Sequence, residues 1–297
     1  MALQQLINAL VFGSVLTLFS LGLSLAWGTL DVLNLAHGSL FVLAGFLTYE
    51  LTTHTSIPFV LVLLMSMIGA GLVSAAMELA AFRHIRNRFR IKRQAELSFL
   101  VASIGASTIL DTIVSNKSNN TPFAPAPGSF NVHSYQIGSA RITNIEIIIV
   151  VVAVIVAIAM DVWVRRSRQG RAVRAVAYDG VTSSLMGVNV NLVAAGTMFV
   201  AGLLAGLAGV LLAVNIGGED VTTGQDYLLT AFAILIVGGV GNIRGAVASA
   251  YLIAAVETAV VAWGPANWRD GVAFALILLI LLVRPQGLFS GKRFQRA

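Results

Sequence analysis

Long apolar segments separated by short polar connections follow one another along almost the whole chain. A helix needs about 20 residues to cross the roughly 30 Å of hydrocarbon in a bilayer. The second apolar segment contains several polar residues, so we expect it to be interrupted or not to cross fully, which gives eight or nine spans. The predicted spans cover residues 6–27, 30–49, 57–82, 96–115, 144–164, 191–215, 226–240, 246–263 and 269–283. The expected fold class is an all-α, polytopic integral membrane protein with a single transmembrane domain over residues 1–297.

The composition supports a membrane protein and excludes several other classes. Of the 297 residues, 57% are hydrophobic and 11% are charged, and the mean hydropathy is +0.87. An average soluble domain has about 25% charged residues. Cysteine is absent from the sequence, which excludes a disulfide framework, a thiolate metal site and a cysteine nucleophile. The formal net charge of +6 suggests a nucleic-acid partner only until the positions of the charges are considered.

The basic residues fall into three clusters, at positions 83–93, at positions 165–174 and in the C-terminal tail 284–297, and none precedes Arg83. Predicted membrane spans flank each cluster directly, which argues against a nucleic-acid surface. Lys and Arg accumulate in short cytoplasmic segments of membrane proteins, so we expect all three clusters in the cytoplasm. Two predicted spans separate the first pair of clusters and four separate the second pair, and these even numbers agree with that topology.

The longest polar connection, residues 116–143, lies outside the cell by the same parity. It contains three prolines and is too short and polar for a core of its own. An ordered external loop and a proline-rich linker both remain open for it. The connection 165–190 is assigned to the cytoplasm.

A group of polar residues interrupts the second predicted span. Asp31, Asn34 and His37 recur every three residues, which predicts one narrow polar stripe on a helix, and Gly38 follows it. Ionisable groups that face lipid cost several kcal/mol, so the stripe should face other helices or an aqueous path. Two interpretations of the stripe remain open, interhelical contact and path lining. The same two interpretations remain open for Glu257 in a later span. A metal site at His37 is not expected, because no ligand follows four residues later.

No motif for ATP binding or hydrolytic chemistry is found. The pattern GxxxxGK is absent at all three lysines, and GxSxG and HExxH are absent too, so we do not expect an enzyme. The glycine-rich stretch 238–245, GGVGNIRG, carries Arg244 where a dinucleotide motif has its last glycine, and no predicted strand precedes it. We interpret it as a tight turn between two helices. A small-residue face predicts close helix packing at Gly202, Gly206 and Gly209.

The cytoplasmic connection 165–190 contains a short amphipathic stretch in which valine, alanine and tyrosine alternate with arginines. Its length, about 25 residues, exceeds what a helix connection needs, and connections of that size tend to be functional. A short helix is expected from near Asp179 to Gly187, with Ser183 and Leu185 near its middle. It is either a docking helix for a cytoplasmic partner or a helix lying on anionic lipid headgroups, and the polar residues after the arginines favour docking.

Four motifs in order, LNLAHGSLFVLAGF, GRAVRAVAYDGVTSSLMGVN, GGVGNIRGAV and RPQGLF, resemble the permease subunits of bacterial ABC importers for branched-chain amino acids. The likeness covers nearly the whole chain and is to the permease type whose second membrane segment carries NxAHG. It implies that Asn34, His37 and Gly38 lie near the translocation path. Asp31 and Glu257, which are polar residues within apolar segments, are further candidates for residues of the path. It also implies that residues 170–189 supply the coupling helix. The candidate residues for ATPase coupling are Arg171, Arg174, Asp179, Ser183, Leu185 and Gly187.

The resemblance implies a set of partners. A second, related permease would complete the membrane part, two ATPase subunits would dock on the cytoplasmic face, and an external binding protein would deliver the substrate. No cofactor is expected in this chain, since ATP and magnesium would be bound by the ATPase subunits. Membrane lipid surrounds such a subunit, nucleic acid is not a partner, and the expected location is the bacterial plasma membrane.

The function expected from these observations is inward transport of branched-chain or other small apolar amino acids. Importers of urea and short amides have similar permeases and form the first alternative. An ion-coupled secondary transporter would need carboxylates near the membrane midplane, for which Asp31 and Glu257 are the candidates, but it has no need of the long basic connection. A passive channel would need a ring of selectivity residues, which we do not identify. An assembly scaffold would leave the stripe at 31–37 unexplained.

Overall fold

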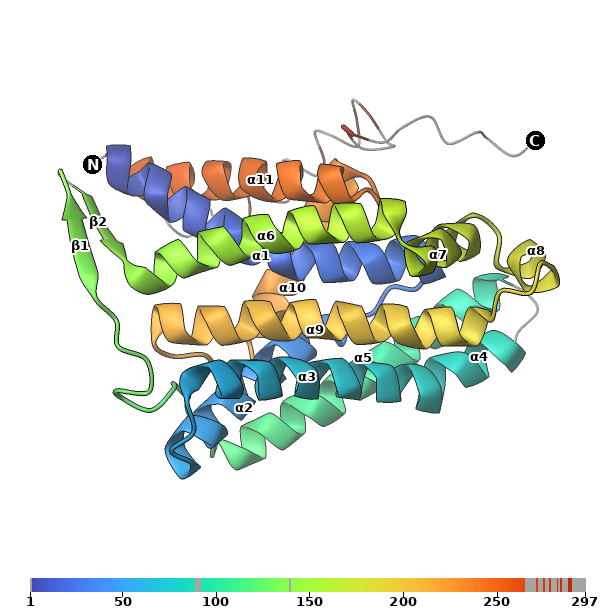
Figure 1. Ribbon diagram of the computed structural model, residues 1–297, viewed down its shortest axis with the longest axis horizontal. Helices are drawn as coiled ribbons and strands as arrows, with labels where there is room; N and C mark the ends of the chain where they lie inside the picture. The colour runs from blue at the N-terminus through green and yellow to red at the C-terminus, as the bar shows by residue number, and fades with distance from the viewer. Residues whose placement is uncertain are drawn as a thin grey trace.

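The computed structural model (Figure 1) describes three continuous stretches of the chain and some single positions beyond them. The stretches are residues 2–88, 92–138 and 140–264, and the single positions are 271, 275, 278, 282, 284, 288 and 289. Apart from these single positions, the last predicted span, 269–283, and the C-terminal tail, 284–297, therefore lie outside the described residues.

The described stretches form a helical bundle with one short β-hairpin. In chain order they contain α1 (Ala2–Leu30), α2 (His37–His54), α3 (Phe59–Met77), the π-helical turn η1 (Glu78–Phe82), α4 (Arg83–Arg88), α5 (Lys92–Lys117), β1 (Ser134–Ile137), β2 (Ala140–Thr143), α6 (Asn144–Arg166), α7 (Arg168–Tyr178), α8 (Gly180–Leu185), α9 (Val190–Ile216), α10 (Thr223–Gly238) and α11 (Ile243–Trp263). The strands are antiparallel, with Ser134 opposite Thr143 and Ile137 opposite Ala140.

Six helical segments among the described residues are long and apolar enough to cross a membrane. They are α1, the continuous segment Phe59–Arg88, most of α5 from Gln94, α6, α9 and α11. The helix α10 is apolar but shorter, and α2 is polar at both ends; both lie in the interior of the bundle. The prediction of an all-α, polytopic membrane protein is confirmed, and the hairpin is an addition that the sequence pattern did not indicate.

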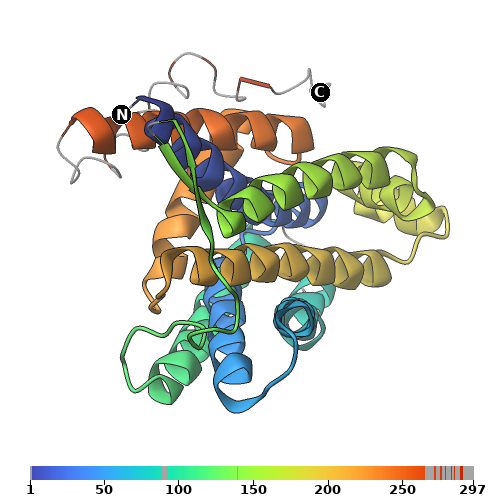
Figure 2. The same ribbon diagram turned by 60° about the vertical axis from the view of Figure 1, so that its left-hand side comes forward.

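The centre of the bundle is α9, which packs against α1, α2 and α3, while α1 in turn packs against α6 and α11. Figure 2 shows α10 rising steeply between the end of α9 and α11, next to α2. Most of α9 is buried, whereas α5 and α6 expose long apolar faces. An apolar face of a membrane helix that the chain itself leaves uncovered is available to lipid or to a second subunit.

The glycines of α9 allow this central packing, as predicted. A Cβ atom at Gly202 would lie 2.5 Å from the Ser74 Cβ, and one at Gly209 would lie 2.1 Å from the Phe41 carbonyl oxygen. Those distances are far below van der Waals contact, so α2 and α3 approach α9 only because these positions lack a side chain. The small-residue face is thus a packing device.

The two ends of the bundle differ in character. Figure 1 shows the hairpin β1–β2 at one end and the helices α4, α7 and α8 at the other. The first basic cluster falls on α4 and the start of α5, and the second falls on the end of α6 and on α7. The two clusters therefore lie at the same end, as the parity of the spans requires.

The long polar connection at the hairpin end packs against the helices through described residues, as expected of an ordered loop. Phe123 is buried and packs edge-on against Phe46, with ring centroids 5.4 Å apart. Its backbone exchanges two hydrogen bonds of 2.9 Å with Glu219, between α9 and α10. A capping box at Thr143 and Glu146 then starts α6.

Candidate functional site

The residues of the predicted polar stripe lie in a break between two helices, so the expected helical stripe is wrong. The helix α1 ends at Leu30 and α2 begins at His37, with an irregular connection between them. Asp31 adopts a left-handed backbone with a φ of 56°, a conformation that few residues other than glycine adopt. Asn34 is 1% exposed, and its Oδ1 accepts a hydrogen bond of 3.1 Å from the Ala36 amide. The three residues therefore do not share one helix, so they do not form a stripe along one helical face.

The His37 side chain links α2 to α1. Its ring is fully buried, and Nε2 donates a hydrogen bond of 3.1 Å to the Phe19 carbonyl oxygen. The ring also lies 4.7 Å, centroid to centroid, from the Phe19 ring. A Cβ at Gly22 would lie 3.0 Å from the His37 Cε1, so the small residue makes room for the imidazole. This geometry is that of an interhelical contact.

We expect His37→Ala to lower the amount of folded protein and its transport activity in proportion. The change removes the hydrogen bond to Phe19 and leaves a void among buried aromatic rings, which together cost about 2–4 kcal/mol. Membrane levels and the thermal unfolding midpoint of purified protein measure this. His37→Gln, whose amide can still donate to Phe19, serves as control and should be the milder change. Normal levels and stability combined with lost transport would instead assign His37 to the translocation path.

Aromatic rings and close backbone contacts fill the interior beside His37. The rings of Phe41 and Tyr227 stack with centroids 5.2 Å apart, and Phe19 meets Phe41 edge-on at the same distance. Gly38 lies against the Gly224 backbone, where an added Cβ would come within 2.3 Å of the carbonyl oxygen. Asn34 and His37 are both buried, so neither side chain is accessible to solvent in this conformation. Their place near the translocation path stays a prediction.

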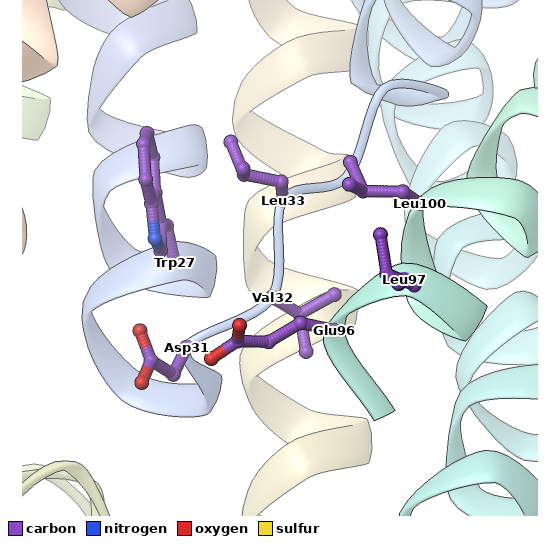
Figure 3. Close-up of a pocket in the computed structure, with 7 residues that line it drawn as sticks. All are labelled: Trp27, Asp31, Val32, Leu33, Glu96, Leu97 and Leu100. Carbon is purple, nitrogen blue, oxygen red and sulfur yellow. The ribbon is translucent and has the colours of Figure 1, made fainter. Parts of the chain in front are cut away.

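Asp31 does line a pocket, of about 410 Å³, at the end of α1. Figure 3 shows its apolar wall, formed by Trp27 and by Leu33, Leu97 and Leu100, and the carboxylate of Glu96 pointing from α5 toward Asp31. The hydropathy pattern marked Glu96 only as the start of a span. Its proximity to Asp31 depends on how α5 packs beside the connection, which no local signal shows.

A second pocket, of about 560 Å³, adjoins the first and shares Trp27 and Asp31 with it. Its other walls come from Arg86 and from the junction of α7 and α8 at Tyr178–Gly180. The pocket therefore lies between the connection that leads to Asn34 and the segment predicted to dock a cytoplasmic partner. Residues separated by about 150 positions in sequence meet there.

The short helix α8 has the predicted limits. Asp179 caps its N-terminus, where the carboxylate accepts hydrogen bonds from the amides of Val181 at 3.0 Å and Thr182 at 3.2 Å. Gly187, with a φ of 86°, follows its end. Leu185 is the last residue of the helix rather than a central one, and it is 81% exposed, whereas Ser183 is 7% exposed and packs inward.

The arginines Arg171 and Arg174 are exposed on α7, and each also contacts a backbone carbonyl at the end of α6. The Arg174 guanidinium donates a hydrogen bond to the Val164 carbonyl, and Arg171 makes a 3.5 Å contact with the Arg166 carbonyl. Cations at the C-terminus of a helix interact favourably with its dipole. Both arginines thus brace α7 against the end of α6, and α7 itself buries Val173 and Val176 toward the bundle.

Two buried carboxylates were missed by the sequence reasoning. Glu78 is fully buried in η1 and pairs with Arg86, Nη2 to Oε1, at 2.6 Å. The same Arg86 Nη2 donates at 2.9 Å to Asn191, and so ties α4 to the start of α9. The signal that was available is a glutamate within an apolar run, with arginine two helical turns later.

The second buried carboxylate that the sequence reasoning missed is Glu219, which lies between α9 and α10. It is 1% exposed, and neither carboxyl oxygen has a hydrogen-bond partner among the described residues. A Cβ at Gly45 would lie 2.0 Å from its Oε2, so the glycine of α2 accommodates it. Burial, and then the neighbouring Asp220 charge, raise the pKa of Glu219 well above its ordinary value, which favours the neutral form.

Glu257, one of the predicted path residues, is buried on α11 together with Ala254 one turn earlier. Ala254 approaches Gly13 of α1, so this face of α11 packs within the bundle. Glu257 lies on α11, whereas Asp31, Asn34 and His37 lie at the connection between α1 and α2.

Comparison with known proteins identifies the family of this bundle. Residues 5–281 match the family model described as the branched-chain amino acid transport system / permease component. The high-affinity branched-chain amino acid transport system permease protein LivH of Salmonella typhimurium is 30% identical over 97% of this chain and 95% of its own length. LivH of Escherichia coli K12 has the same identity and coverage, and BraD of Pseudomonas aeruginosa, a permease of the same description, is 29% identical over 97% and 95%. No solved structure matches the chain. The match of the family model over residues 5–281 and the likeness over 97% of the chain show that this chain belongs to the permease family of branched-chain amino acid transport systems.

Proposed function

We propose that this chain is a membrane-spanning permease subunit of an ATP-driven importer that moves branched-chain amino acids into the cytoplasm. The observation that carries the substrate class is the likeness over 97% of the chain to permeases of high-affinity branched-chain amino acid transport. ATP and magnesium belong to the ATPase subunits in this proposal, since the chain has no P-loop sequence.

The complete importer would contain a second, related permease, two ATPase subunits and an external binding protein, in the plasma membrane of a bacterium. The exposed apolar faces of α5 and α6 leave surface for a second permease. The end that carries α4, α7 and α8 would face the cytoplasm, because it holds the basic clusters. The binding protein would then meet the end that carries the hairpin β1–β2.

The contacts around α8 suggest how ATPase movement would reach the membrane helices. A switching element must transmit a displacement as a rigid body, and α8 is short, capped and joined directly to α7. The helix α7 packs against α1 and α9 through its buried valines. The α7–α8 junction and the end of α1 also line the same pocket. A push on α8 would therefore act on the connection that holds Asp31 and Asn34.

We expect ATP-dependent leucine uptake when this chain and the partner subunits of the proposed importer are reconstituted into vesicles with ATP inside and binding protein outside. Uptake of radiolabelled leucine should require both ATP and the binding protein. A proton ionophore and sodium removal should leave it unchanged, because hydrolysis alone supplies the energy.

Unlabelled isoleucine and valine should compete in this assay, and urea and acetamide should not. Competition by urea in place of valine would replace the substrate class with short amides. Uptake that persists without ATP and collapses with the ionophore would replace the importer with a secondary transporter.

A further inference from the structure

An apolar groove of about 390 Å³ opens between α6 and α11 near the basic end of the bundle. Figure 1 shows these two helices running side by side toward that end. Ile158 and Val162 of α6 form one wall, with Val247 of α11 opposite, and the small Ala248 leaves the floor open. Ile158 is 61% exposed and Val162 is 46% exposed. The groove therefore faces outward from spans that cross the membrane.

Three charged side chains stand at the end of this groove, and their charges do not cancel. The Asp161 carboxylate accepts hydrogen bonds from Arg244, through Nε at 3.2 Å and Nη2 at 2.9 Å, and from the Arg165 Nε at 2.8 Å. One carboxylate thus orients two guanidinium groups and leaves a net positive charge. The side chains of Arg165 and Arg244 remain 54% and 67% exposed.

This arrangement matches the two parts of an anionic phospholipid. A guanidinium that is already fixed by a carboxylate can present its remaining N–H donors to a phosphate in a defined direction. The head groups of anionic lipids attract basic residues at the cytoplasmic surface of a membrane. An acyl chain is the ordinary neighbour of exposed isoleucine and valine at this depth, and the groove below the arginines gives it a place next to the phosphate.

We propose that the groove between α6 and α11 is a binding site for one anionic phospholipid. An acyl chain lies along Ile158, Val162 and Ala248, and the phosphate lies between Arg165 and Arg244. Asp161 is a positioning residue that holds both guanidinium groups toward the phosphate. The bound lipid fastens α11 to α6 at the end where α7 begins.

Native mass spectrometry of the purified full-length chain with added phosphatidylglycerol tests the site. Arg244→Gln removes the charge, and Ala248→Leu fills the groove while it keeps every charge. Each change should weaken phosphatidylglycerol retention about tenfold and abolish its increase of the thermal unfolding midpoint. Phosphatidylcholine should bind both native and variant chains weakly. Glycerophosphoglycerol, which has the phosphate but no acyl chain, should not compete.

Arg168→Gln is the matched control, because it removes one exposed positive charge at the same end of the molecule but not from the groove. It should retain the lipid as the native chain does. Equal weakening by Arg168→Gln would show a diffuse charge effect and overturn the proposal. Unchanged retention in Ala248→Leu would also overturn it, and if that variant loses a second permease subunit instead, the groove is a protein interface.

Discussion

Leu185→Glu is expected to abolish transport and ATPase association while the chain still inserts and accumulates at native levels. Leu185 is 81% exposed at the end of α8, next to Met186, which is 82% exposed. Because both side chains are exposed, a substitution there should not alter the folding of this chain. In a partner groove, however, an unpaired carboxylate costs about 2 kcal/mol or more, which weakens binding roughly 30-fold. Co-purification of the ATPase subunits with the tagged chain, and leucine uptake, measure the effect.

Gln169→Glu provides the matched control for this prediction. It adds the same negative charge at an exposed position of α7, and the new carboxylate can still accept the 3.3 Å hydrogen bond from the Trp163 Nε1. ATPase association and uptake should remain near native values in this variant. If Leu185→Glu retains the ATPase subunits through purification and transports at the native rate, α8 is not the coupling helix and lies on lipid headgroups instead.

Gly38→Ala is expected to prevent accumulation of the folded chain, although it adds only one methyl group. The new Cβ would lie 2.3 Å from the Gly224 carbonyl oxygen and 3.4 Å from the Leu228 Cβ. Because the first obstacle is backbone, α2 and α10 would have to separate, and overpacking of that kind costs about 1–3 kcal/mol or more. The two helices also position the stacked rings of Phe41 and Tyr227. Membrane levels and size-exclusion profiles in detergent report the loss.

Gly196→Ala makes the same chemical change where α9 has open space, with nothing within 4 Å of an added Cβ. There the substitution should be neutral or stabilise the helix by up to about 1 kcal/mol, since alanine loses less backbone entropy than glycine. Native levels and an unchanged unfolding midpoint for Gly38→Ala would mean that α2 and α10 do not cross as closely as described.

Helix limits were predictable wherever hydropathy changes sharply. The span expected at 144–164 is α6, and the span expected at 191–215 is α9, each extended by only a few residues. The helix α8 was also accessible from sequence, because Asp179 and Gly187 are local signals whose capping geometry needs no distant contact. The predicted helix limits were wrong where local periodicity competed with tertiary packing, as at the break between α1 and α2 at residues 31–36.

The candidate site was predictable in its members but not in its geometry. Asn34 and His37 were found because polar residues in an apolar segment are unusual, yet their spacing indicated a stripe that does not exist. The partner of His37, the Phe19 carbonyl, is a backbone group and carries no sequence signal. Glu96 reaches the pocket beside Asp31 only through the packing of α5. Whether these residues act on substrate stays a prediction for the variants above.

The sequence by itself determined that this chain is a helical membrane protein, which end of it is basic and which short helix projects from that end. Hydropathy, charge and capping are properties of neighbouring residues, so they can be read without coordinates. Only the tertiary structure decided that Glu219 is buried against Gly45 and that Arg244 shares Asp161 with Arg165. Such contacts join segments that are far apart in the chain, and their energies depend on burial and distance, which local pattern does not contain.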